Sequence, residues 1–143
     1  MAMLEAAQTK AGEVVYDLGC GDGRVLVIAA QKFGARAVGV EISPKQVETA
    51  NENIRRNGLQ DRARVIKGDL METDLREADV VTLYLLTSSN EIIRPLLEKQ
   101  LKPGARVVSH DFEVKGWKPV RVEKIGAHNR MHPIYVYEMP VRK

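Results

Sequence analysis

Apolar runs and amphipathic segments alternate along most of the chain. Five short runs, several of them rich in β-branched residues, predict strands at residues 13–18, 37–41, 62–67, 78–86 and 105–109. Four other segments repeat an apolar residue every three or four positions and predict helices at residues 3–10, 23–33, 44–57 and 88–101. Strands that alternate with helices in this way favour an α/β fold with a parallel sheet.

Several helix ends carry local signals. Ser43 is a good N-cap, Pro44 suits the first helical position, and Gln46 completes a capping box. Gly34 supplies a stop for the helix at 23–33. Pro95 falls inside the helix at 88–101 and predicts a kink or a late restart there.

The alternation stops after residue 110. Residues 120–125 and 133–139 alternate between apolar and polar positions, which predicts two antiparallel strands. Residues 111–119 show no helical period, so we expect a loop there in place of another helix.

Composition narrows the class of protein only slightly. The 143 residues suit one domain, with 44% hydrophobic and 29% charged residues. The net charge of +3 permits acidic partners without requiring nucleic acid. Cys20 is the only cysteine, which excludes an internal disulfide and a cysteine-based zinc site. No run approaches the ~18 apolar residues of a membrane span and the start is unlike a signal peptide, so we expect a cytoplasmic protein with no membrane partner.

The first apolar run leads into a turn with three glycines, Gly19, Gly21 and Gly23. A turn that approaches a ligand needs positive φ angles and no Cβ in the way, which glycine provides. The amides at the start of the following helix would face that ligand and favour an anionic group. The alternative is a glycine turn that merely joins a strand to a helix.

Two acids follow later strands. Glu41 ends the second run, where a carboxylate can accept hydrogen bonds from both hydroxyls of a ribose. Asp69 follows the third run after Gly68. The alternatives are a solvated strand end for Glu41 and a helix cap for Asp69.

These three motifs, in this order, resemble the class I S-adenosylmethionine-dependent methyltransferases, whose first motif is the Asp-x-Gly-x-Gly-x-Gly that runs from Asp17 to Gly23. The resemblance implies one domain over residues 1–143 with an α/β fold, Rossmann-like and doubly wound. Its sheet would be mostly parallel and seven-stranded, with an antiparallel C-terminal strand. It also implies S-adenosylmethionine as cofactor and S-adenosylhomocysteine as product, and no metal ligand is identified.

The same resemblance assigns cofactor contacts residue by residue. It implies that Asp17, Gly19 and Gly21 surround the methionine part of the cofactor and that Glu41 binds the ribose. Ile42 would pack on the adenine face. Asp69 would accept the adenine amino group, with the Leu70 amide beside it.

The acceptor is indicated by less general stretches. The chain lacks the Asn/Asp-Pro-Pro-Tyr/Phe motif of many amino-methyltransferases and lacks a cysteine at the end of the fourth strand. Residues 84–87, 90–91, 101–104, 108–112 and 116–117 look like the small archaeal protein-lysine methyltransferases of broad specificity, relatives of the mitochondrial enzyme that methylates the ATP synthase c subunit. The partners would then be proteins with exposed lysines. The alternatives are a methyltransferase for a small molecule or an RNA base, and a catalytically silent cofactor-binding domain of a complex.

Tyr84 is the candidate catalytic residue, because it lies near the end of the fourth predicted strand and can orient a lysine amine; the alternative is a core tyrosine at a strand end. His110 and Asp111 can act as a proton path, but positioning of their loop is the favoured interpretation. Trp117 can form part of an apolar entrance or plug the space under that loop.

In the archaeal group a segment usually precedes the first helix and helps to cover the cofactor. This chain begins inside that helix, so we expect low cofactor affinity or activity, or a shortened chain.

Overall fold

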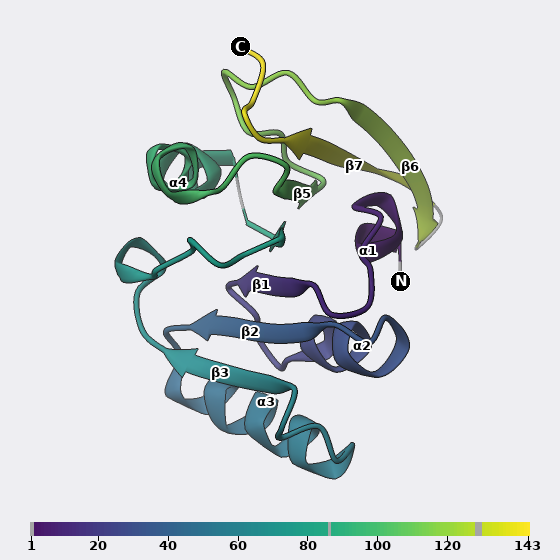
Figure 1. Cartoon of the computed structure of the whole chain (residues 1–143), viewed down its shortest axis with the longest axis vertical. Coiled ribbons are helices and arrows are strands. Elements are labelled where there is room, and N and C mark those ends of the chain that lie inside the picture. The colour runs from purple at the N-terminus through teal and green to yellow at the C-terminus, as the bar shows by residue number, and fades with distance from the viewer. Residues whose placement is uncertain (1, 86, 128–129) are drawn as a thin grey trace.

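The computed structural model describes residues 2–85, 87–127 and 130–143 (Figure 1). Its helices are α1 (Ala2–Ala6), α2 (Arg24–Lys32), α3 (Pro44–Arg56) and α4 (Thr87–Gln100), with a 3₁₀ turn η1 (Leu70–Glu72). Its strands are β1 (Val14–Leu18), β2 (Arg36–Glu41), β3 (Ala63–Lys67), β4 (Val80–Leu83), β5 (Arg106–His110), β6 (Arg121–Ala127) and β7 (Arg130–Glu138).

Within these residues, one sheet of seven strands has the order β3-β2-β1-β4-β5-β7-β6. Figure 1 shows this succession from β6 and β7 at the top to β3 at the bottom. Neighbours from β3 to β5 pair in parallel, whereas β7 is antiparallel to both β5 and β6. The predicted α/β class, the mostly parallel sheet and its antiparallel closing strands are therefore confirmed.

Successive residues of the central strands point to opposite faces of the sheet. Val15 and Val80 pack in a core with residues of α1, α2 and α3 on one face. Tyr16 and Val81 pack in a second core with residues of α4 on the other face. Burial on both sides explains why these strands are nearly continuous in apolar residues. No helix in the described part of the chain is both long enough and apolar enough to cross a bilayer.

The close approach of β2 to the glycine turn depends on one small residue. A Cβ on Gly39 would lie 2.6 Å from Cys20 Sγ and 2.7 Å from a methyl carbon of Leu26. These separations are shorter than van der Waals contact allows, so only glycine lets the turn and α2 rest directly on β2. The position of the turn is thus set by the strand beneath it.

The first helix is shorter than predicted, ending at Ala6 instead of continuing to residue 10. Gln8 has a φ of 55°, and the Thr9 N–H donates to the Leu4 carbonyl while the Gln8 N–H donates to Glu5. This is the hydrogen-bond pattern of a Schellman motif, which ends a helix. Leu4 and Ala7 are buried, as the apolar spacing predicts.

The helix signals at Ser43 and Pro95 are only partly correct. Ser43 caps α3, since its hydroxyl accepts from the Gln46 N–H at 3.4 Å. The second half of the capping box is wrong, because the Ser43 N–H donates to Glu41 instead. The helix α4 runs continuously across Pro95, so no late restart occurs. Burial of Ile93 and Leu97 against the sheet offsets the hydrogen bond that proline cannot make.

The fourth strand spans only four of the nine predicted positions. Its last paired residue is Leu83, which lies between Leu18 of β1 and Ser109 of β5. Because β1 ends at Leu18, the chain beyond Leu83 has no partner on the β1 side, and it leaves the sheet although β5 continues to His110. Residue 86 of the predicted strand lies outside the described residues. This early exit places Tyr84 above the sheet edge instead of inside it.

Candidate cofactor-binding cleft

The strand order reverses between β1 and β4, and the glycine turn lies at the carboxyl end of β1. Ligands of open α/β sheets bind at such a point. Gly19, Gly21 and Gly23 have φ angles of 76°, 56° and 84°, which side chains other than glycine rarely adopt. The Gly19 and Cys20 N–H groups donate to the Val40 carbonyl at 2.8 and 3.1 Å. The turn is therefore fixed to β2.

Two cavities meet at Gly19 along this edge of the sheet. One, of about 490 Å³, lies between α2 and the end of β4 and includes Asp17, Gly19, Gly21 and Tyr84 in its lining. The other, of about 450 Å³, lies over the ends of β2 and β3 and is lined by Gly19, Glu41, Ile42, Gly68, Asp69, Leu70 and Leu85. All eight predicted site residues line one or both of them, so the structure brings these residues together. We call the pair the cofactor cleft.

The cleft has room for a nucleoside cofactor. A Cβ on Gly21 would meet no atom within 4 Å, so the backbone at Gly21 faces open space. Each cavity is within the size range of about 300–1,000 Å³ that small-molecule sites occupy. The acids of the cleft also fit S-adenosylmethionine, with Asp17 in one cavity and Glu41 and Asp69 in the other.

Glu41 is a bridge between two loops. One carboxylate oxygen accepts the Gly21 N–H at 2.9 Å, and the other accepts the Ser43 N–H at 3.0 Å. The interpretation of Glu41 as a merely solvated strand end is therefore wrong. Each carboxylate oxygen keeps a second lone pair, which remains able to accept a ribose hydroxyl.

Asp17 is a buried acid in the floor of the cleft. It is 4% exposed, and one of its oxygens accepts the Thr82 hydroxyl at 2.8 Å. Burial raises its pKa to about 7, against the Thr82 hydrogen bond, and the charge of Glu41 adds to the rise. A cation nearby would shift this group toward its ionised form. The sulfonium and ammonium groups of the cofactor would provide such a charge.

The second cavity contains the residues predicted to bind adenine. Ile42 is 69% exposed, which leaves an apolar side chain available to cover a flat ring. Asp69 caps η1, because its side chain accepts the Met71 N–H at 2.9 Å. The capping alternative is thus confirmed, and a contact of Asp69 or the Leu70 amide with adenine stays a prediction.

Tyr84 is exposed and held by a neighbouring ring. Its side chain is 64% exposed, so the alternative of a core tyrosine is wrong. Its ring stacks on His110, with centroids 4.5 Å apart and planes inclined by 17°. No local pattern predicts this stacking, because the two residues are 26 positions apart and belong to different strand ends. Trp117, in contrast, is buried edge-to-face against Tyr137 and fills the core under its loop.

Cys20 is unsuited to nucleophilic chemistry. Burial, together with the charges of Asp17 and Glu41, raises the pKa of its thiol to about 12. The thiolate is the reactive form, so almost none is present near neutral pH. Cys20 is a small residue accommodated by the turn, as the sequence indicates.

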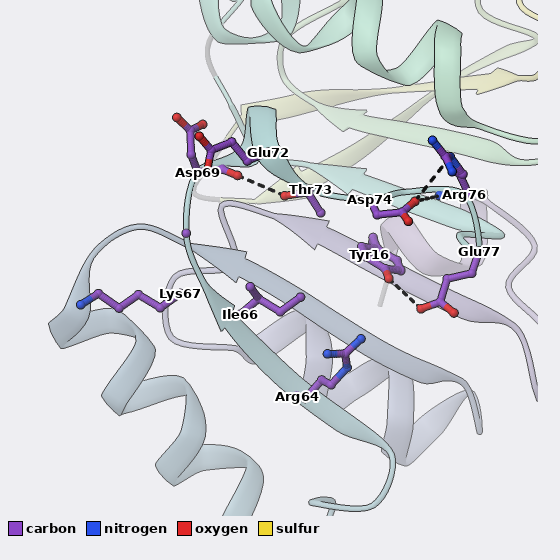
Figure 2. Close-up of a pocket in the computed structure, with 11 residues that line it drawn as sticks. Tyr16, Arg64, Ile66, Lys67, Asp69, Glu72, Thr73, Asp74, Arg76 and Glu77 are labelled. Carbon is purple, nitrogen blue, oxygen red and sulfur yellow. Dashed lines mark hydrogen bonds and ion pairs between the residues drawn. The ribbon is translucent and has the colours of Figure 1, made fainter.

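A third cavity, of about 500 Å³, adjoins the cleft over β3 and β1 and shares Gly68 and Asp69 with it (Figure 2). Figure 2 shows Tyr16 directed at Glu77, and its hydroxyl donates to that carboxylate at 2.7 Å. Burial and this interaction raise the pKa of Tyr16 to about 12. The sequence did not predict this cavity, because it is formed by the segment after η1 folding back over the sheet.

The fold, the glycine turn at the reversal of strand order and the acids near the carboxyl ends of β1 and β2 define an S-adenosylmethionine-dependent methyltransferase. The sequence model of the ANTKMT methyltransferase domain matches residues 17–121, and the chain belongs to this family. The predicted family and the predicted cofactor, S-adenosylmethionine, are confirmed.

Individual relatives agree with this assignment. A protein-lysine N-methyltransferase of Saccharolobus islandicus is 50% identical over 136 residues, which cover 94% of this chain and 84% of the relative. The mouse adenine nucleotide translocase lysine N-methyltransferase is 36% identical over 84% of this chain and 52% of its own. A solved structure of an RNA methyltransferase from Salinibacter ruber with S-adenosyl-L-homocysteine has a TM-score of 0.89 and 44% identity, covering 96% of this chain and 88% of that one.

Replacement of Glu41 tests its role at the ribose. Glu41→Ala is expected to weaken S-adenosylhomocysteine binding by about 1–3 kcal/mol, roughly 5- to 150-fold, because hydrogen bonds to a charged group are lost. Isothermal titration calorimetry measures the change. Glu48→Ala, which removes an exposed acid of α3, is the matched control and should bind normally. An unchanged affinity for Glu41→Ala would remove this residue from the ribose site.

Replacement of Asp17 tests the buried acid. Its folded pKa of about 7 lies above the ordinary value of 3.8, so the folded protein binds the extra proton and loses stability as pH rises from about 4 to 7. At pH 8 the free energy of unfolding of Asp17→Asn is therefore expected to exceed that of the wild type by on the order of a few kcal/mol. Its melting temperature should be higher than that of the wild type at pH 8 and similar to it at pH 4. Its cofactor affinity at pH 8 should fall. An equal difference in melting temperature at both pH values would contradict this assignment.

Proposed function

We propose that this protein transfers the methyl group of S-adenosylmethionine to lysine side-chain amines of other proteins. The observation that carries the proposal is the 50% identity to a protein-lysine N-methyltransferase over nearly the whole chain. The mouse relative is likewise named for a lysine acceptor. The exposed Tyr84 at the cleft supports the proposal, because it offers a hydroxyl and an aromatic face beside the predicted methionine site.

The chemistry requires alignment and deprotonation. When bound, the cofactor supplies a methyl group on a sulfonium, which is already a good leaving group. A lysine amine with a reference pKa of ~10.4 is protonated at pH 7, and its neutral form costs roughly 4–5 kcal/mol. An apolar entrance lowers this cost by disfavouring the ammonium. Tyr84 and Leu85 line the cleft where the acceptor would enter, and the Tyr84 ring would attract the charge that develops on nitrogen.

The assigned contacts follow the same arrangement. Asp17, Gly19 and Gly21 would hold the methionine part in one cavity. Glu41, with Ile42, Asp69 and Leu70, would hold the ribose and adenine in the other. The hydroxyl of Tyr84 would orient the lysine amine toward the methyl group.

RNA is the second candidate acceptor. The Salinibacter ruber protein, 44% identical to this chain, is named an RNA methyltransferase. The net charge of +3 is compatible with this acceptor but does not favour it over protein.

A radiolabelled methyl-transfer assay on a mixed lysate separates the candidates. We expect label in the protein fraction that resists nuclease, is released by protease and is recovered as methyl-lysine. Label that nuclease removes would support the RNA candidate. Tight cofactor binding without transfer to any fraction would favour a silent cofactor-binding domain.

Replacement of Tyr84 tests its role in the transfer. Tyr84→Phe keeps the ring that stacks on His110 but removes the hydroxyl, so kcat is expected to fall about 2- to 10-fold, as for the loss of one hydrogen bond, with unchanged cofactor affinity. Tyr16→Phe removes a hydroxyl that bonds to Glu77 in the third cavity and should transfer methyl groups normally. Full activity of Tyr84→Phe would exclude the hydroxyl from the reaction.

A further inference from the structure

The carboxyl end of β5 and the first half of β7 bring two imidazoles to one carboxylate. His132 Nδ1 lies 2.8 and 3.0 Å from the two oxygens of Asp111, and His110 Nδ1 lies 3.5 Å from one of them. The pairing of β5 with β7 produces this cluster, because His110 lies opposite Ile134 and the Asp111 N–H donates to the Pro133 carbonyl at 2.9 Å.

The donor atoms have the spacing of ligands around one metal ion. One ligand atom from each of these three residues lies within 4.8 Å of the others. Bonds of about 2.1 Å to a metal place neighbouring ligand atoms about 3.0 Å apart in octahedral and about 3.4 Å apart in tetrahedral geometry. The nitrogen–oxygen distances of 2.8–3.5 Å in the structure span these values. Two imidazoles with one carboxylate form a donor set for zinc and neighbouring transition metals.

The backbone at Asp111 is held in an unfavourable conformation. Its φ is 65°, and the Phe112 N–H donates to the His110 carbonyl across it at 2.8 Å. A γ-turn with positive φ is rare and strained, and such strain concentrates at functional sites. Here it accompanies a carboxylate that lies between two imidazoles, each only 9% exposed as a residue. The packing therefore fixes the donors before any ion arrives.

We propose that His110, Asp111 and His132 form a binding site for a divalent transition-metal ion of the zinc type. The ion would join the end of β5, the 111–119 loop and β7. The ion would also lie next to Tyr84, because the His110 ring that binds the ion stacks on the Tyr84 ring. The site does not depend on the identity of the methyl acceptor, so it can be tested apart from the proposed function.

Metal-free protein, prepared with a chelator, is titrated with Zn²⁺ by calorimetry and with Co²⁺ by visible absorption. We expect one ion per chain, and Co²⁺ bands typical of mixed nitrogen and oxygen ligands. His110→Ala and His132→Ala should each weaken Zn²⁺ binding at least tenfold, while both proteins still bind S-adenosylhomocysteine. Asp74→Asn, a carboxylate change outside the cluster, should leave Zn²⁺ affinity unchanged.

The NMR signals of the histidine rings in the wild-type protein give a second measurement, which does not depend on whether the histidine variants fold. The ring signals of His110 and His132 should shift together at one equivalent of Zn²⁺. No saturable binding up to millimolar Zn²⁺, binding unaltered by both histidine changes, or ring signals of either residue that do not move would each overturn the proposal.

Discussion

The cofactor cleft depends on how the glycine turn is joined to the end of β2. Two hydrogen bonds reach the Val40 carbonyl from the turn, and Glu41 accepts one more from Gly21 and another from Ser43. The turn, the end of β2 and the start of α3 are therefore one hydrogen-bonded unit. Without these hydrogen bonds the turn would be free to move, because glycine has more backbone conformations available than any other residue.

This unit is preorganised for its ligand. Gly39 lets the turn rest on β2, and Glu41 holds its amides in place before the cofactor arrives. Binding then needs little ordering of the backbone, which reduces the entropic cost of association. The buried Asp17 works in the opposite direction, since its ionised form is disfavoured in the free protein. The cleft thus combines a rigid frame with one destabilised charge.

Much of the fold could be predicted because its signals are local. Apolar runs and glycine stops identified the strands and most helices, and the order of motifs identified the family and the cofactor. The errors arose where tertiary contacts decided the outcome. The fourth strand stops at Leu83, level with the end of its neighbour β1 at Leu18, and the Ser43 N–H donates to Glu41 instead of to the side chain of Gln46. Neither partner choice is visible in a local pattern.

In the candidate site, too, local signals could be read from the sequence and tertiary contacts could not. Residues that follow strands could be placed at one edge of the sheet, since parallel strands share that edge. The stacking of Tyr84 on His110 and the meeting of Asp111 with His132 could not be predicted, because both depend on the register between strands distant in the sequence. The double role of Glu41 was also missed, since a carboxylate at a strand end gives no sign of which amides it will accept.

The buried carboxyl group at position 17 has a consequence for the lifetime of the protein in a cell. A ligand that binds only the folded form raises the free energy of unfolding in proportion to the logarithm of its concentration. Near neutral pH Asp17 is partly ionised, which destabilises the free protein. Stabilisation by the bound ligand is therefore most important at that pH. Proteases act on the unfolded fraction, so the abundance of the enzyme would follow the supply of S-adenosylmethionine. A cell short of this methyl donor would then contain less of the folded enzyme as well.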